Sequence, residues 1–247
     1  MADRVVGKRT PQGPAKRFRS CRGHFWHNFC VNPRTRIAFR VLALWLASSA
    51  YAQQGPASVT FKLDFPGADP SHYEIAVQSD GRATYASNGK MSEQGDPAEA
   101  TPVAFTISDS LRAQIFDLAK RAHYFSGKVD SGRKNLANTG AKTLAYKDAS
   151  RSSEATYNYS EVVPVAQLTS IFQNLSTTLE CGRRLSYFHK YEKLALEGEL
   201  KRMEDLEKQN SLGEVQPIAP ILKEISNDPS VMNVSRARAL RLLAAAK

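Results

Sequence analysis

The chain has 247 residues and a formal net charge of +10, but this charge is concentrated at its beginning. Residues 1–52 hold ten of the 34 Lys and Arg residues and one of the 24 Asp and Glu residues, a net of +9, which leaves +1 for residues 53–247. A segment so close to neutral lacks the basic surface that nucleic acids require, which excludes a nucleic-acid-binding protein. The only cysteine after residue 52 is Cys181, so internal disulfides cannot stabilise this part, and we expect Cys181 to be buried in apolar surroundings.

Residues 37–52 have the order of a secretory signal. Three arginines precede an apolar run at residues 41–47, and small residues then lead to Ala50-Tyr51-Ala52. The apolar run is too short to span a membrane, which takes about 20 residues. We therefore expect cleavage after Ala52 and a mature protein in the periplasm or outside the cell; the alternative is a buried core helix.

Residues 1–30 are basic and lack hydrophobic periodicity, which is typical of a misassigned start or of a long disordered leader. They contain Cys21, His24, His27 and Cys30 at every third position. Structural zinc sites separate two pairs of ligands so that the chain can wrap around the ion, and this even spacing does not. We predict no metal site in this segment.

Strands are predicted at residues 59–65, 73–77 and 82–86. Apolar and polar residues alternate strictly in the first of these, as in a half-buried strand. The other two flank a hairpin turn, whose length decides the register. A two-residue loop would pair Ile75 with Ala86, whereas a bulged turn at Ser79-Asp80-Gly81 pairs Ile75 with Tyr85. The bulged turn collects the apolar side chains on one face, so we choose it.

A fourth strand is predicted at residues 103–107, followed by an amphipathic helix over residues 109–122 with Ser108 as its N-cap. Residues 143–147 and 155–159 form a second predicted hairpin. The polar loop before it, residues 127–140, is either a solvated loop or an anion site. The cations in or next to this loop are Lys128, Arg133, Lys134 and Lys142.

Helices are predicted for the remainder of the chain. One covers residues 162–178, a break is expected at Cys181-Gly182, and a second helix covers residues 183–209. Helical spacing returns at residues 218–225, and Asp228-Pro229 is expected to start the last helix.

These elements predict an α+β fold, in which helices pack on an antiparallel sheet of five or six strands and a helical extension follows. We assign residues 1–52 to the leader, 53–178 to the α+β domain and 179–247 to the helical C-terminal region. The apolar stripes of the last helices must be buried, either in a small helical subdomain or against a partner. We expect a chain that ends at Thr178 to fold and to lose partner binding.

A resemblance rests on short motifs within residues 59–178. The motifs are Tyr73…Asp80-Gly81…Tyr85, Phe105-Thr106-Ile107-Ser108, Ile115-Phe116, Tyr124-Phe125 and Thr143-Leu144. Together they resemble an uncharacterised domain of secreted bacterial proteins, which combines such a hairpin with a strand, a helix and a second strand pair. The resemblance implies a fold and an extracytoplasmic location, but no activity.

The sequence contains no recognisable catalytic motif. We assign no catalytic, cofactor-binding or metal-binding residue, and we expect no cofactor. The preferred hypothesis is an exported, non-catalytic protein that binds a partner protein in the cell envelope or outside the cell, or that self-associates through its C-terminal helices, with no stable membrane span. The alternative is an extracytoplasmic hydrolase of unrecognised type, which would gather His72 or His123 with acids and a hydroxyl in a concave site, with His189 on a helix surface.

Overall fold

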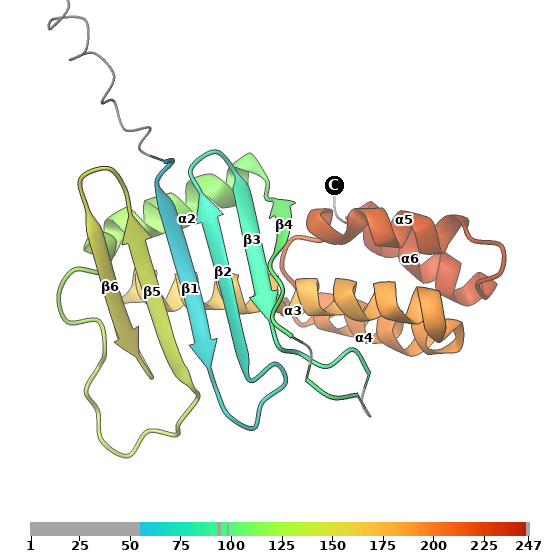
Figure 1. Cartoon of the computed structure of the whole chain (residues 1–247), viewed down its shortest axis with the longest axis horizontal. Coiled ribbons are helices and arrows are strands. Elements are labelled where there is room, and N and C mark those ends of the chain that lie inside the picture. The colour runs from blue at the N-terminus through green and yellow to red at the C-terminus, as the bar shows by residue number, and fades with distance from the viewer. Residues whose placement is uncertain (1–54, 93–94, 98, 246–247) are drawn as a thin grey trace, which may run out of the picture. The chain divides into compact units, whose positions relative to one another are not determined.

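Six antiparallel strands form one sheet in the order β4-β3-β2-β1-β5-β6 (Figure 1). The computed structural model describes residues 55–92, 95–97 and 99–245. The strands are β1 (Ser58–Asp64), β2 (His72–Gln78), β3 (Arg82–Ser87), β4 (Val103–Thr106), β5 (Ala141–Lys147) and β6 (Ser152–Tyr157). The predicted α+β fold with an antiparallel sheet is thus confirmed.

The hairpin between β2 and β3 has the register that the bulged turn predicts. Ile75 lies opposite Tyr85 and Val77 opposite Ala83. The N–H of Gly81 donates to the carbonyl of Gln78 at 3.0 Å, and Gly81 has a φ of +87°, which favours glycine. The turn therefore places every large apolar side chain of this hairpin on one face of the sheet.

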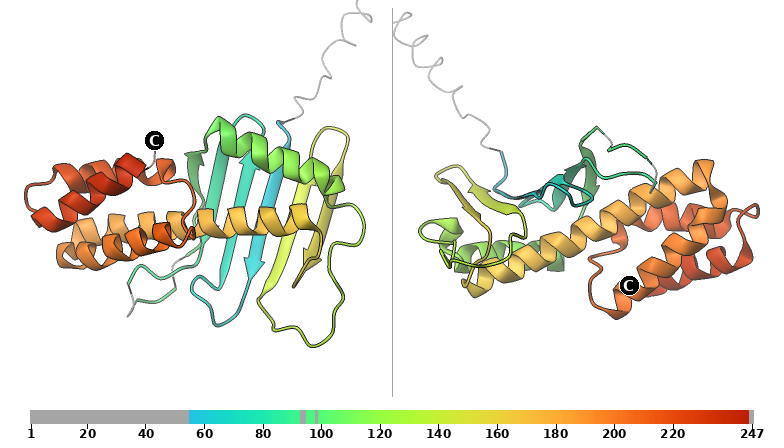
Figure 2. Two further views of the ribbon diagram at one scale, coloured as in Figure 1. Left: turned by 180° about the vertical axis from the view of Figure 1, so that it is seen from behind. Right: turned by 90° about the horizontal axis from the view of Figure 1, so that it is seen from below.

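Helices cover that apolar face, and the opposite face is polar. Helix α2 (Asp109–Arg121) and helix α3 (Val163–Tyr191) lie side by side across this face of the sheet, in front of the strands in the left view of Figure 2. The Ser108 hydroxyl accepts the N–H of Leu111 at 3.1 Å and so caps α2, as predicted. The uncovered face carries pairs such as Lys62 with Glu74, 3.1 Å apart.

Helix α3 is longer than predicted, because Gly182 does not break it. A β-carbon at this position would lie 2.3 Å from Cγ2 of Ile218, so the glycine permits close packing of a later segment on the helix. The predicted boundary at residue 178 consequently falls inside α3. The Thr178 hydroxyl also accepts the N–H of Gly213 at 2.8 Å, which joins the later chain to this part of α3. The expectation that a chain ending at Thr178 folds stays a prediction, although such a chain would lack the C-terminal part of α3.

The C-terminal helices fold back on α3 and on one another, which is the helical subdomain of the two alternatives considered. They are η3 (Lys193–Ala195), α4 (Leu196–Lys208), η4 (Gln216–Ile218), α5 (Ala219–Asn227) and α6 (Asn233–Ala245), while η2 (His123–Phe125) follows α2. Leu200, Met203 and Leu222 are fully buried, so most of the apolar stripes is covered within the chain, although Leu194 is exposed. The last helix begins at Asn233 and not at Asp228, because the Asp228 carboxylate accepts the N–H and the hydroxyl of Ser230 and forms a turn.

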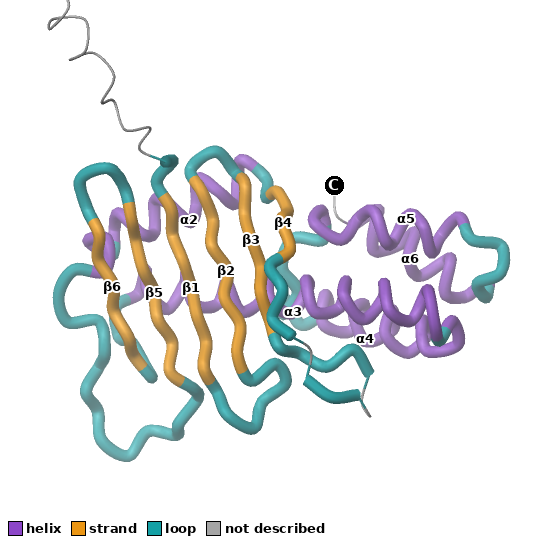
Figure 3. Tube along the Cα trace, viewed as in Figure 1, coloured by secondary structure: helices purple, strands orange, loops and turns teal. Residues whose placement is uncertain are grey.

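Helix α3 runs across the strands and projects beyond β4 (Figure 3). Its contacts pass from β6 to β3 along the helix: Thr169 with Tyr157, Phe172 with Phe61, and Glu180 with Tyr85. A helix of 29 residues is about 44 Å long, whereas six strands span about 24 Å between the outermost two. The C-terminal part of α3 therefore has no strand above it.

Candidate functional site

A groove of about 870 Å³ lies where α3 emerges from under the sheet. Its first wall is the edge strand β4, its floor is α3, and its second wall is η4 and α5. The residues that line it are, on the sheet side, Tyr85, Met91, Val103, Ala104 and Phe105; on α3, Leu179, Gly182, Arg183, Ser186, His189 and Lys190; and on the second wall, Pro217, Ile218, Pro220, Ile221 and Glu224. Most of this lining is apolar, in contrast to the polar open face of the sheet.

At this wall the backbone of β4 presents polar groups that no other described residue pairs. The N–H of Ile107 donates to the carbonyl of Gly81 at 3.1 Å, and hydrogen-bonded pairs alternate along an antiparallel ladder. The pairs Phe105–Ala83 and Val103–Tyr85 are therefore hydrogen-bonded. The N–H and C=O of Ala104, which lies between Phe105 and Val103, then point away from β3, toward the free edge.

At Val103 the helices no longer cover the apolar face of the sheet. Val103 lies opposite the buried Tyr85, on the face that the helices cover elsewhere, yet it is 53% exposed. Valine is among the residue types that are most often fully buried. Among the described residues no element covers Val103, and its side chain lines the groove.

The other edge strand, β6, has a charged residue at its outward-bonding position. The N–H of Asp148 donates to the carbonyl of Arg151 at 2.9 Å, which by the same alternation directs the N–H of Glu154 to the free edge. Charged residues on an edge strand oppose the addition of another strand. The corresponding residue of β4 is Ala104, which offers no such protection.

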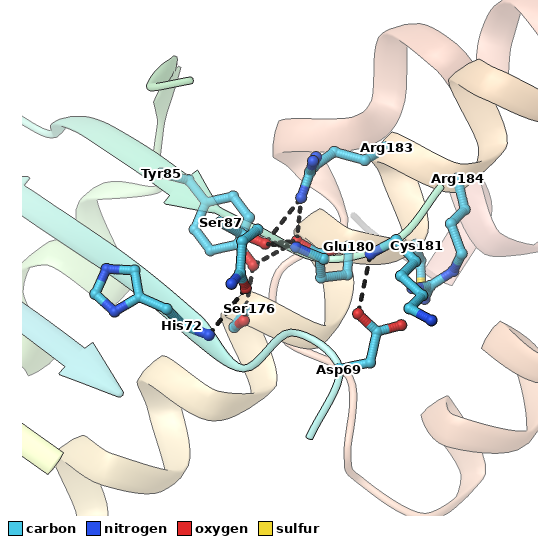
Figure 4. A network of polar contacts seen from close by, with 12 residues as sticks. Asp69, His72, Tyr85, Ser87, Ser176, Glu180, Cys181, Arg183 and Arg184 are labelled. Atoms are coloured by element: carbon cyan, nitrogen blue, oxygen red, sulfur yellow. Dashed lines mark hydrogen bonds and ion pairs between the residues drawn. The ribbon is translucent and has the colours of Figure 1, made fainter. Parts of the chain in front are cut away.

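A buried polar network lies under the sheet end of the groove (Figure 4). One oxygen of Glu180, Oε1, accepts hydrogen bonds from Tyr85 Oη at 2.7 Å, from Ser87 Oγ at 2.6 Å and from Arg183 Nη1 at 2.7 Å. The same Arg183 nitrogen donates to Ser87 Oγ at 2.8 Å, and Ser176 Oγ lies 3.0 Å from Tyr85 Oη. Glu180 is only 3% exposed, and a buried charge is costly unless it is paired. Arg183 and the two hydroxyls compensate the charge of Glu180.

Burial raises the pKa of Tyr85 well above its usual range, and the negative charge of Glu180 raises it further. The phenol is therefore neutral and serves as a hydrogen-bond donor. The network holds the Arg183 side chain in place through Glu180 and Ser87. Arg183 is also one of the residues that line the groove.

The three histidines are not brought together. His72 lies on β2 with Nδ1 2.6 Å from the Asp64 carboxylate, and His123 is exposed after α2. His189 lines the groove, but its Nε2 lies 2.9 Å from the carboxylate of Asp228. Hydrolysis by a serine nucleophile needs a hydroxyl hydrogen-bonded to such a base. Among the residues that the structure describes, no serine, threonine or cysteine side chain is bonded to a histidine ring.

Cys181 is buried on α3, as expected, and not reactive by its surroundings. Burial raises the pKa of its thiol to about 12, and the nearby Glu199 carboxylate contributes. Arg202 and Arg184 both bind Glu199, with nitrogen–oxygen distances of 2.8 Å and 3.0 Å. Burial opposes ionisation of Glu199, but these two arginines outweigh it and lower its pKa.

The loop before β5 does not gather its cations. The Lys142 ammonium turns inward and donates to the carbonyls of Thr139, Gly140 and Asn158 at 3.0–3.3 Å. Arg133 pairs with Glu161. Two of the four cations considered for an anion site are thus engaged within the chain.

Residues 55–92, 95–97 and 99–245 present neither a metal-ligand cluster nor a membrane-spanning helix. No group of three or more His, Cys, Asp or Glu side chains in these ranges could hold a metal ion. No helix within them is long and apolar enough to cross a membrane. The spaced residues from Cys21 to Cys30 and the predicted signal lie outside the described residues.

Sequence reasoning missed the two residues that support the floor of the groove, Glu180 and Arg183. Their positions carried a signal. Ser176, Glu180 and Arg183 follow one another at spacings of four and three residues, beside the apolar stripe of α3. A charged residue in that position needs a buried partner, which could have been sought on the strands.

Comparison with known proteins gives no match, neither to a protein-family model nor to a curated protein. The candidate function therefore rests on the groove, on the free edge of β4 and on the charges that line the floor.

Proposed function

We propose that the protein is exported and acts without catalysis, by binding an extended segment of a partner protein as a seventh strand beside β4. The observation that carries this proposal is the free edge at Ala104, whose N–H and C=O point into the space above α3. Backbone groups in this arrangement are complementary to another extended backbone, as in domains that recognise peptides by strand addition.

The groove adds apolar surface, which the free edge of β4 alone does not provide. An added strand would lie about 4.8 Å beyond β4 and over the projecting part of α3, with every second side chain directed to the floor. Val103, Ile221 and Pro220 offer it apolar surface. Burial of apolar surface is worth about 25 cal/mol per Å², so two or three buried side chains supply most of the binding free energy.

The short strand limits the affinity. β4 has four residues, and only the residues that alternate with the paired ones bond outward, so a bound segment gains few main-chain hydrogen bonds. Ordering a peptide also costs free energy. We therefore expect a dissociation constant of about 1 µM or weaker, which corresponds to about −8 kcal/mol.

Proline substitution tests strand addition directly. Ala104→Pro removes the outward N–H, whereas the ladder to β3 uses Val103 and Phe105, so the variant should fold; proline is tolerated on an edge strand where its nitrogen faces solvent. The probe is a random heptapeptide library displayed on phage and selected against the unaltered protein. Synthetic peptides from the selection should bind Ala104→Pro at least about tenfold more weakly.

The matched control is Glu154→Pro, which removes the outward N–H of the opposite edge strand. Its peptide affinity should equal that of the unaltered protein. Equal affinity of a folded Ala104→Pro variant, or no enrichment of any heptapeptide, would contradict strand addition at β4. Export is tested separately by the intact mass of the protein recovered outside the cytoplasm, which should begin at Gln53; a species that retains residues 37–52 would contradict it.

A further inference from the structure

We infer that the bound strand carries a carboxylate, and that Arg183 binds it at the Val103 end of β4. The inference rests on the proposed function, since it specifies the chemistry of the partner segment. Three features lead to it: the fixed position of Arg183, the charges of the groove lining, and the composition of the segments of this chain that could compete for the site.

Arg183 is held in place by one nitrogen. Nη1 donates both to Glu180 Oε1 at 2.7 Å and to Ser87 Oγ at 2.8 Å. Ser87 follows Tyr85 by two residues on β3, and Tyr85 lies opposite Val103, so the guanidinium is next to the Val103 end of β4. Arg183 lines the groove and its side chain remains 18% exposed.

This fixation favours recognition of a carboxylate. A guanidinium presents five N–H donors in a planar fork, and its paired geometry matches the two oxygens of a carboxylate. A flexible surface arginine loses side-chain entropy when it binds such a group. Arg183 has already lost much of that freedom, because the buried Glu180 and Ser87 orient it before a ligand arrives.

The charged residues of the groove lining also favour an acidic ligand. Arg183 and Lys190 on the floor are basic; the acids near them are Glu224 on the second wall and Glu180, which is buried and bonded to Arg183. His189 is held by Asp228 at 2.9 Å. β4 itself carries no charge. An approaching strand is therefore favoured if an acidic group lies over α3 and disfavoured if a basic group does.

Complementarity also disfavours two segments of this chain, the β4 strand of a second copy and the apolar leader segment. A second copy could pair its own β4 with this edge, but the sequence of that strand, Val103 to Thr106, contains no carboxylate. The apolar leader segment, residues 37–52, contains none either. We therefore commit to a segment of another protein that has an acidic side chain, or its C-terminal carboxylate, beside apolar residues.

The selection described above supplies the probe. Heptapeptides enriched on the unaltered protein should contain Asp or Glu beside apolar residues, and should lack Lys and Arg. One enriched peptide is then synthesised together with its Glu→Gln or Asp→Asn form. The acidic peptide should bind the unaltered protein about tenfold more tightly than the amide form.

The double variant E180Q/R183Q tests the assigned residue. It removes one negative and one positive charge, so the net charge of the protein is unchanged and Glu180 is not left without its partner. The preference for the acidic peptide should fall from about tenfold to less than about twofold. Lys201→Gln, an exposed position on α4 outside the groove, should leave the preference intact.

The outcomes separate this inference from the proposed function. Equal binding of the two peptide forms to the unaltered protein, with affinity still lost in Ala104→Pro, would overturn the carboxylate inference and leave strand addition in place. The same result decides the question even if E180Q/R183Q fails to fold. A dimer in solution that Ala104→Pro converts to a monomer would overturn the inference by showing that a second copy occupies the edge. Failure of every peptide would overturn the proposed function as well.

Discussion

The hydroxyl of Tyr85 lies 2.7 Å from Oε1 of Glu180, although the two residues are 95 positions apart in the chain. This contact joins β3 to α3 at the point where the helix leaves the cover of the sheet. Glu180 also accepts a hydrogen bond from Arg183, so the contact with Tyr85 helps to hold Arg183 in place. The core of the sheet and the floor of the groove thus share one buried polar network.

Removal of the Glu180 carboxylate should destabilise the protein strongly. Glu180→Ala leaves Arg183 without its charge partner and two hydroxyls without their acceptor, and the loss of one member of a buried ion pair typically costs about 3–5 kcal/mol. Urea unfolding measures the change. The control is Glu74→Ala, which breaks an exposed pair with Lys62 and should cost less than about 1 kcal/mol. Equal losses for the two variants would mean that the network does not stabilise the fold.

Gly182→Ala should disturb the packing of η4 on α3. The added methyl would lie 2.3 Å from Cγ2 of Ile218, and overpacking of this kind typically costs about 1–3 kcal/mol. In the double variant G182A/I218A the space is restored, so the two free-energy losses should not add. Gly198, whose β-carbon would meet nothing within 4 Å, is the matched control, and Gly198→Ala should not destabilise. Additive losses for G182A and I218A would contradict the packing described.

The Cys181 thiol should resist modification in the folded protein. It is buried, and burial raises its pKa to about 12, so almost no thiolate is present at neutral pH. In the protein that begins at Gln53, in which Cys181 is the one cysteine, Ellman's reagent should react only after addition of denaturant. Rapid reaction with the native protein would show that this part of α3 opens readily.

The turn between β5 and β6 should lose stability in acid. The N–H of Ser150 donates to Asp148 and, with further hydrogen bonds, lowers the pKa of Asp148 from 3.8 to about 2. A depressed folded-state pKa gives stability that is fully present above the unfolded value near 3.8 and is lost as the pH falls through about 2. The difference in unfolding free energy between the unaltered protein and Asp148→Asn should therefore be constant from pH 7 to pH 5 and shrink below about pH 4. A pH-independent difference would contradict the assignment.

Local sequence patterns predicted the sheet and its covering helices, because each rests on a rule that acts within a few residues. Alternation located β1, and the position of Gly81 in the turn decided the register of Ile75 against Tyr85. The N-cap Ser108 located α2. Such signals depend on the backbone conformation and on which face is buried, and neighbouring residues determine both.

The sequence-based predictions were wrong where contacts between residues distant in the chain outweigh a local preference. Gly182 has low helix propensity, but Ile218 packs against it and α3 continues. The pair Asp228-Pro229 favours a helix start, yet the Asp228 side chain closes a turn with Ser230. The candidate site was missed for the same reason, since its walls come from β4, α3 and α5, and no local pattern brings these three together.

Hydrogen exchange at the amide of Ala104 tests the central claim most directly. In the free protein this N–H faces the open edge, so its exchange should be fast, whereas the amide of Val103, in the ladder to β3, should be protected. Saturation with a selected heptapeptide should slow exchange at Ala104 by about tenfold or more and leave the amide of Glu154, on the opposite edge, unchanged. Peptide binding without protection of the Ala104 amide would contradict strand addition at β4.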